Sequence, residues 1–308
     1  MAVHIIGMPI YHGCDKFGSN LGPDKFRELD VLSAIKSLGY DTRDLGNIEV
    51  ADVSVEDKYK HHPCLKYYDV IIDANTKLAF KVYESISTGN FPVVLGGDHS
   101  LGIGSIAGVS KAVKNLGIVW IDAHGDLNTH DTTITGNIHG MPLAASIGKG
   151  PDKLVNLFEH RVKVKDENVV HIAGRDLDPG EIELIKNSKI KAFNMDEIRK
   201  YGIEKVVNNA INYLRSKVDA IHVSFDIDSI DLAYVPGTGT PVKDGLTIEE
   251  AKKTLEMFAS SGLMVSLDFV ELNPLLDYND VTANISSELL TRIFENLVVP
   301  VNDQLKLG

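Results

Sequence analysis

Cysteine is scarce in this chain: Cys14 and Cys64 are the only two among 308 residues, and they form no Cys-x-x-Cys pattern. Disulfide scaffolds and thiolate zinc sites need more cysteines at closer spacing, so both classes are excluded. Low cysteine content suits a reducing compartment. The first residues also lack a basic segment followed by a long apolar stretch, so we expect no signal peptide and a cytoplasmic location.

Long apolar runs and excess positive charge are missing as well. No stretch of about 18 apolar residues occurs, which excludes a membrane-spanning helix. Lysine and arginine total 31 against 43 aspartates and glutamates, a net charge of −12. Nucleic-acid binding needs a basic surface, so we expect neither nucleic acid nor a membrane as a partner. A cationic small molecule stays compatible with this charge.

Short apolar runs dominate the pattern that is present. Most are continuously apolar, as in strands that are buried on both faces of a parallel sheet. The chain has seven clear runs and a weaker eighth at its end, at 3–6, 91–95, 117–121, 168–173, 190–193, 220–225, 264–270 and 297–301.

Amphipathic segments fill the gaps between these runs. Helices are predicted over 22–38, 70–87, 104–114, 180–187, 203–216, 247–260 and 284–297. Alternating strands and helices imply βαβ units with right-handed crossovers. Because no linker or repeat interrupts the pattern, we expect one three-layer α/β domain over residues 1–308.

Three of the predicted strands are followed closely by aspartate, and two of these segments also contain histidine. The segments read Gly-Gly-Asp-His-Ser over 96–100, Asp-Ala-His-Gly-Asp over 122–126 and Phe-Asp-Ile-Asp over 225–228. In an extended chain, side chains two residues apart project to the same side. The carboxyl ends of parallel strands share one edge of a sheet, where ligands bind in α/β folds. We therefore expect these side chains to converge.

The converging acids would repel one another without neutralising cations. The four acids are Asp122, Asp126, Asp226 and Asp228. Two divalent cations would balance their charge, and His99 and His124 would complete a set of six ligands. Oxygen and nitrogen ligands without thiolate favour Mn²⁺, with Fe, Co or Ni as alternatives. A metal pair lowers the pKa of bound water and supplies a bridging hydroxide for hydrolysis at an electron-poor carbon or phosphorus.

These motifs closely resemble those of the arginase and agmatinase family, the manganese ureohydrolases. The resemblance runs from the Gly-Pro pair at 22–23 to the Leu-Asp-Phe-Val-Glu-Leu-Asn-Pro segment at 267–274. It implies a three-layer α/β/α sandwich with a mostly parallel eight-stranded sheet, two Mn²⁺ ions per chain, and a homo-oligomer, either a trimer or a hexamer. It also implies that one ion is bound by His99, Asp122, Asp126 and Asp226, and the other by Asp122, His124, Asp226 and Asp228.

The resemblance also assigns substrate-binding residues. Glu271 matches the acid that receives the guanidinium group. Asn128 and Thr135 match residues that bind an α-carboxylate, although the family usually has serine at the position of Thr135. Asp178 matches the residue that recognises the α-amino group, and Glu181 matches one that assists it. These pairings are chemically sound because carboxylates accept hydrogen bonds from cations, while amides and hydroxyls donate to a carboxylate.

Two residues are candidates for proton transfer. His139 matches the proton-shuttling histidine of the family, and histidine titrates near neutral pH. Asp126, besides binding metal, is placed to take a proton from the hydroxide and pass it to the leaving amine.

The implied activity is that of an arginase, which hydrolyses L-arginine to L-ornithine and urea. Agmatinase, guanidinobutyrase and formimidoylglutamase share the metal motifs and stay open as alternatives. A one-zinc acyl-lysine deacetylase needs a different arrangement of Asp and His. A non-catalytic binding protein would not need the full ligand set together with His139 and Glu271.

Residues near these motifs have simpler interpretations. Trp120 precedes Asp122 inside an apolar strand and is expected to pack in the core. Arg175 and Asp176 are adjacent and are expected to form a structural charge pair.

Overall fold

Eight strands form a single sheet whose order is β2-β1-β3-β8-β7-β4-β5-β6, and every paired neighbour runs parallel. This computed structural model describes residues 1–300. The strands are β1 (Ala2–Met8), β2 (Asp41–Asn47), β3 (Phe91–Gly96), β4 (Leu116–Ile121), β5 (Val169–Ile172), β6 (Lys191–Phe193), β7 (Ala220–Asp226) and β8 (Met264–Val270). The remainder of the expected 1–308 domain, residues 301–308, lies outside the described residues.

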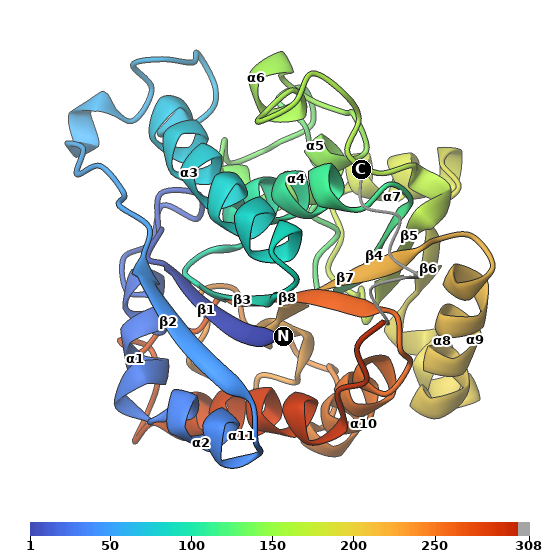
Figure 1. The fold of residues 1–308 in the computed structure, drawn as a ribbon. Helices are drawn as coiled ribbons and strands as arrows, with labels where there is room; N and C mark the ends of the chain where they lie inside the picture. The colour runs from blue at the N-terminus through green and yellow to red at the C-terminus, as the bar shows by residue number, and fades with distance from the viewer. Residues whose placement is uncertain (301–308) are drawn as a thin grey trace.

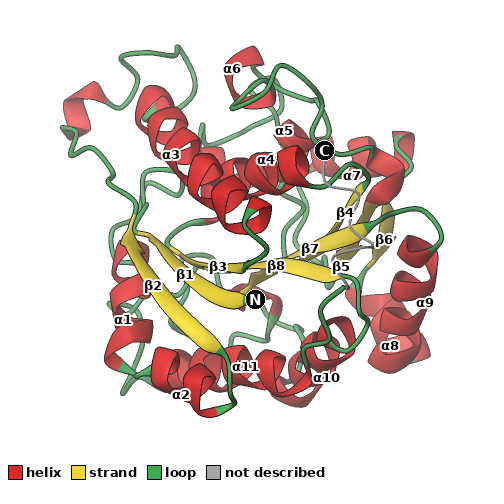
Figure 2. Ribbon diagram, viewed as in Figure 1, coloured by secondary structure: helices red, strands yellow, loops and turns green. Residues whose placement is uncertain are grey.

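Helices cover both faces of the sheet (Figure 1, Figure 2). One face carries α3 (Tyr68–Ser87), α4 (Gly102–Ala112), α5 (Pro142–Ser146), α6 (Asp152–Val155) and α7 (Pro179–Asn187). The opposite face carries α1 (Gly22–Glu28), α2 (Val31–Ser37), α8 (Met195–Tyr201), α9 (Ile203–Arg215), α10 (Ile248–Ala259) and α11 (Val281–Asn296). The arrangement confirms the predicted three-layer α/β/α sandwich.

Each face of the sheet has its own hydrophobic core. Leu78 of α3 and Ile106 of α4 pack in one core, and Phe258 of α10 and Phe294 of α11 pack in the other. All of these side chains are buried. Burial on both faces explains why the central strands are continuously apolar.

The eighth strand was predicted in the wrong place. The segment 297–300 is not a strand, and Val301, the end of the predicted run, lies outside the described residues. The strand that completes the sheet is β2, whose sequence is Asp-Thr-Arg-Asp-Leu-Gly-Asn. It is an edge strand with mostly exposed side chains, so it carries no apolar run.

The helix predicted over 22–38 is divided in two. Asp30 has a φ of 55° between α1 and α2, in the left-handed region that a continuous helix cannot contain. The short helix α8 was not predicted. None of the helices found over residues 1–300 combines the length and the apolarity needed to cross a bilayer.

Candidate active site and metal centre

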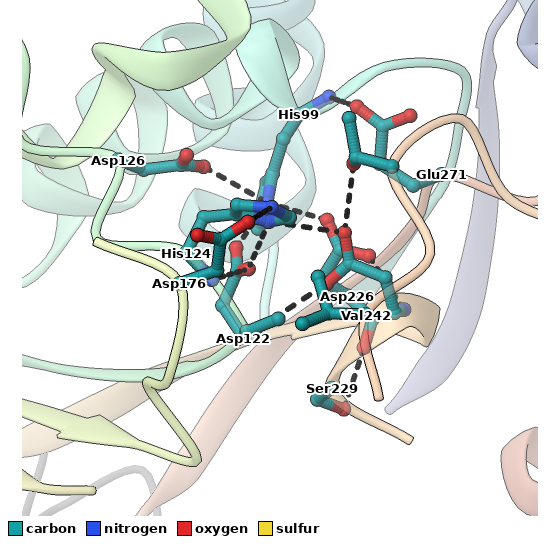
Figure 3. A network of polar contacts seen from close by, with 12 residues as sticks. His99, Asp122, His124, Asp126, Asp176, Asp226, Ser229, Val242 and Glu271 are labelled. Atoms are coloured by element: carbon teal, nitrogen blue, oxygen red, sulfur yellow. Dashed lines mark hydrogen bonds and ion pairs between the residues drawn. The ribbon is translucent and has the colours of Figure 1, made fainter. Parts of the chain in front are cut away.

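The three Asp/His segments meet at the carboxyl ends of β3, β4 and β7 (Figure 3). Nδ1 of His99 lies 3.0 Å from Oδ2 of Asp122, 3.1 Å from Oδ2 of Asp126 and 3.0 Å from Oδ2 of Asp226. The structure thus brings one imidazole nitrogen from β3 against carboxylates from the ends of β4 and β7. The strand order places β7 next to β4 and separates it from β3 only by β8, which explains this convergence.

The second imidazole completes the group. Nδ1 of His124 lies 3.4 Å from Oδ1 of Asp122 and 3.2 Å from Oδ2 of Asp228. Two sets of potential metal ligands result, with the ligand atoms of each set within 4.8 Å of one another. They are His99, Asp122 and Asp126, and Asp122, His124 and Asp228. Asp122 belongs to both sets, so one carboxylate can serve two neighbouring ions.

The electrostatics of the cluster call for a cation. Burial, together with the charge of Asp122, raises the pKa of Asp126 to about 6. Burial and the charges of Asp228 and Asp122 raise the pKa of Asp226 well above its usual range. Burial lowers the pKa of His99 and of His124, but contact with the carboxylates more than offsets this and raises both. The cluster therefore favours positive charge, which protonated imidazoles or bound metal ions can supply.

Unpartnered atoms point to the same conclusion. Nδ1 of His99 and Oδ2 of Asp126 are buried and lie 3.1 Å apart, but neither atom has a hydrogen bond of acceptable geometry among residues 1–300. Nε2 of His99 is 2.8 Å from Oγ of Ser224, so the hydroxyl contacts the far side of the ring and leaves Nδ1 facing the acids. Buried donor and acceptor atoms that converge without hydrogen bonds suit a metal ion, and the nitrogen and oxygen donor set suits Mn²⁺.

A cavity of about 160 Å³ opens beside the cluster. Five predicted metal ligands line it: His99, His124, Asp126, Asp226 and Asp228. The predicted substrate and proton-transfer residues on its wall are Asn128, Thr135, His139, Asp178 and Glu181. The sequence did not identify five further lining residues, which are Thr133, Asn137, Gly140, Asp176 and Thr240. Thr133 and Asn137 flank Thr135 in one polar loop. Their closeness in sequence to Thr135 was the one feature that could have predicted them as cavity residues.

Asn128 and Asp178 are in direct contact on the cavity wall. Nδ2 of Asn128 donates to Oδ2 of Asp178 at 2.8 Å. The hydroxyl of Thr132 donates to Oδ1 of Asn128 at 2.9 Å, which orients the amide so that its NH₂ group faces Asp178. An amide and a carboxylate therefore stand side by side at one end of the cavity.

Glu181 binds the backbone at Asp178 and next to Asn128. Its carboxylate accepts from the backbone N–H of Asp178 at 2.9 Å and from the backbone N–H of Leu127 at 3.0 Å. Burial raises the pKa of Glu181 to about 7. Both oxygens are engaged by backbone amides, so the side chain holds the start of α7 against the loop that follows Asp126.

Glu271 lies directly after β8, although it is absent from the cavity lining. Oε1 accepts from the backbone N–H of His99 at 2.8 Å and lies 3.3 Å from Nδ1 of His139. Burial lowers the pKa of His139, but contact with Glu271 more than offsets this and raises it overall. Oε2 is buried and has no hydrogen-bond partner among the described residues. A Cβ atom at Gly239 would lie 3.4 Å from Oε2, so glycine leaves room beside it.

The expected pair between Arg175 and Asp176 is wrong. Arg175 instead donates to backbone carbonyl oxygens, including those of Asp228 and Ser229. Asp176 is exposed, with Oδ2 3.8 Å from Nε2 of His124. The two side chains thus contact different groups, and no ion pair joins them among the described residues.

Comparison with known proteins identifies the family. A model described as the Arginase family matches residues 1–295. The arginase of Brevibacillus brevis is 44% identical over 290 residues, covering 94% of this chain and 96% of that protein. A crystal structure of the arginase of Bacillus subtilis superposes with a TM-score of 0.89 at 41% identity, covering 95% of this chain and 98% of that one. The arginase of Bacillus caldovelox has a TM-score of 0.90 at 40% identity, covering 95% and 98% of the two chains. The chain therefore belongs to the arginase family.

Proposed function

We propose that this protein is an arginase that hydrolyses L-arginine to L-ornithine and urea with two Mn²⁺ ions bound per chain. One observation carries the proposal: a single cavity has a cluster of candidate metal ligands at its base and the paired Asn128 and Asp178 on its wall. The first feature suits hydrolysis, and the second suits the two charged groups of an α-amino acid. The names of the relatives support the same activity.

The residues proposed to hold the ions are His99, Asp122, His124, Asp126, Asp226 and Asp228. When bound, the metal pair supplies a hydroxide nucleophile at neutral pH. Asp122 lies in both ligand sets and would be shared.

The polar side chains outside the ligand sets are proposed to orient the substrate. Oε2 of Glu271 is the unpartnered buried acceptor for the guanidinium group, which it would bind while Oε1 stays on the backbone of His99. Asp178 carries the charge that suits the α-ammonium group. Asn128 and Thr135 offer an amide and a hydroxyl to the α-carboxylate without adding charge. Glu181 assists by holding Asp178 in place.

Asp126 and His139 are proposed to move protons. Oδ2 of Asp126 is buried and faces the cluster, where it would take a proton from the nucleophile and pass it to the leaving amine. His139 has its side chain 20% exposed, so it connects the buried site with solvent. Contact with Glu271 orients its ring.

Other features of the proposal extend beyond the site. We propose one ureohydrolase domain over residues 1–308, a homo-oligomer that is a trimer or a hexamer, and a cytoplasmic location. The family resemblance supports the oligomer, and the low cysteine content supports the location.

Urea release from a set of guanidino compounds tests the function. Protein loaded with Mn²⁺ is assayed on L-arginine, agmatine and 4-guanidinobutyrate. We expect urea mainly from L-arginine, because Asn128 and Thr135 suit the α-carboxylate that agmatine lacks and Asp178 suits the α-ammonium group that 4-guanidinobutyrate lacks. Faster release from agmatine or 4-guanidinobutyrate would establish one of the alternatives, and no urea from any compound would overturn the ureohydrolase assignment.

A further inference from the structure

We infer that Arg175 is a positioning residue for one half of the metal centre: its guanidinium group holds the turn that carries Asp228, and its backbone N–H joins the same residue to the loop that carries His124. The inference rests on the proposed metal site and deepens it. Arg175 follows β5, on a loop that supplies none of the six proposed ligands. The side chain of Arg175 acts on the site through hydrogen bonds to backbone carbonyl oxygens.

The guanidinium group of Arg175 is surrounded by carbonyl oxygens. Nη2 donates to the carbonyl of Asp228 at 2.7 Å, and Nη1 donates to that of Ser229 at 3.2 Å. Further bonds go to the carbonyls of Ala173, Ile230, Val242 and Lys243, at 2.9 to 3.3 Å. Figure 3 shows Ser229 and Val242 beside the acid cluster. A planar fork with five N–H groups suits this shell, whereas an ammonium group could donate only three bonds.

These contacts join three separate segments of the chain. The turn 228–230 and the loop 242–243 meet at the guanidinium group, and the backbone N–H of Arg175 donates to the carbonyl of Ala123 at 2.8 Å. Ala123 lies next to His124, and its own N–H is 3.3 Å from Oδ1 of Asp228. Arg175 therefore sets the spacing between the backbones that carry His124 and Asp228.

The charge of Arg175 has no carboxylate partner within hydrogen-bonding distance in residues 1–300. Burial lowers its pKa, while the charges of Asp228 and Asp122 raise it. Partial burial of an unpaired cation is costly, and the ring of carbonyl dipoles offsets that cost. The guanidinium group of Arg175 therefore binds the backbone of the 228–230 turn instead of forming an ion pair.

The contacts of Arg175 reach one ligand set directly, and this set shares Asp122 with the other. Arg175 contacts the turn of Asp228 and the neighbour of His124, which belong to the set Asp122, His124 and Asp228. Within the described residues, it makes no hydrogen bond to the segment 96–101 that carries His99. Loss of the guanidinium group should therefore weaken metal binding at the set that contains His124 and Asp228 and leave binding at the set that contains His99 and Asp126 largely intact.

Manganese titration of metal-free protein tests this inference. Free Mn²⁺ is measured by electron paramagnetic resonance for the wild type, Arg175→Lys and Arg175→Gln. The control is Arg199→Lys, because Arg199 also donates to a carbonyl of the 240–247 loop, that of Gly245, but contacts no ligand turn. We expect two sites in the wild type and in the control. In Arg175→Lys, one site should weaken by roughly 10–100-fold, as is typical when support for a ligand is removed, and the other should be unchanged. Arg175→Gln should lose more affinity at the same site.

Each other outcome has a distinct meaning. Unchanged binding in both Arg175 variants would overturn the inference and leave the proposed function standing. Equal weakening of both sites, or failure of Arg175→Lys to fold while Arg199→Lys folds, would make Arg175 a general structural residue and also overturn it. If the wild type binds no Mn²⁺, the proposed function and the inference both fail.

Discussion

The imidazole of His99 lies flat against the indole of Trp120, with ring centroids 4.0 Å apart and an interplanar angle of 9°. The indole N–H also donates to Oδ2 of Asp122 at 3.1 Å. Trp120 is fully buried, as expected of a core residue, yet it contacts two proposed ligands of one metal ion.

Metal binding should therefore change the fluorescence of Trp120, which is the only tryptophan in the chain. We expect saturable quenching as Mn²⁺ is added to metal-free protein, because the paramagnetic ion would bind next to the ring. Excess chelator should reverse it. Unchanged emission in protein that retains Mn²⁺ by elemental analysis would place the ions elsewhere.

Replacement of Asp126 by asparagine should lower turnover by orders of magnitude. Asparagine keeps the shape of the side chain but cannot take the proton that the mechanism assigns to it. Asp126 has a φ of 52°, a conformation that asparagine tolerates, so the fold should be preserved. The check is kcat for urea release, with circular dichroism as the control for folding. A nearly normal rate would remove Asp126 from the chemistry.

Replacement of Asp178 by asparagine should raise KM for L-arginine by roughly 10–100-fold, the cost of losing a charge-assisted hydrogen bond of about 1.5–3 kcal/mol. Asparagine still serves at the start of a helix, so α7 should remain intact. The measurement is the dependence of initial rate on arginine concentration. An unchanged KM in a stable Asp178→Asn protein would refute the assignment of Asp178 to the ammonium group.

The raised pKa of Glu181 should make the stability of the metal-free protein depend on pH. Its pKa is about 7 in the folded chain, above the ordinary value of 4.5, so the folded state binds more protons between these values. The contribution of Glu181 to stability is thus fully present below pH 4.5 and is lost as the pH rises through 7. Relative to the wild type, Glu181→Gln should gain stability from pH 5 to pH 8, by about 1–3 kcal/mol.

Urea denaturation at several pH values checks this trend. Glu167→Gln serves as the control because Glu167 is also an acid near the sheet, and its carboxylate meets only lysines on the surface. A constant difference between Glu181→Gln and the wild type at all pH values would contradict the raised pKa.

The architecture and the convergence of the six proposed metal ligands could be predicted because both follow from strong local patterns. Continuously apolar strands indicate a covered parallel sheet, and parallel strands end at one edge. The acids after β4 and β7 therefore had to converge on the histidine after β3. The edge strand β2 could not be found in this way because its side chains are exposed and polar.

The residues that hold the proposed ligands in place could not be predicted from such patterns. Arg175 bonds to backbone carbonyls, which every residue possesses, so no pattern of residue types identifies its partners. Ser224 is one serine in an apolar strand, and only the fold places it on His99. The supporting contacts depend on tertiary geometry, whereas the ligands depend on residue type.

The amount of manganese bound by the folded chain shows whether the clustered acids and histidines hold a pair of metal ions. Metal-free protein is loaded with Mn²⁺, freed of excess ions by gel filtration and analysed by plasma mass spectrometry alongside its protein concentration. The shared acid Asp122 and the two ligand sets predict a value close to two ions per chain. A value near zero in folded protein would contradict the account, because the buried acids would then be balanced without metal.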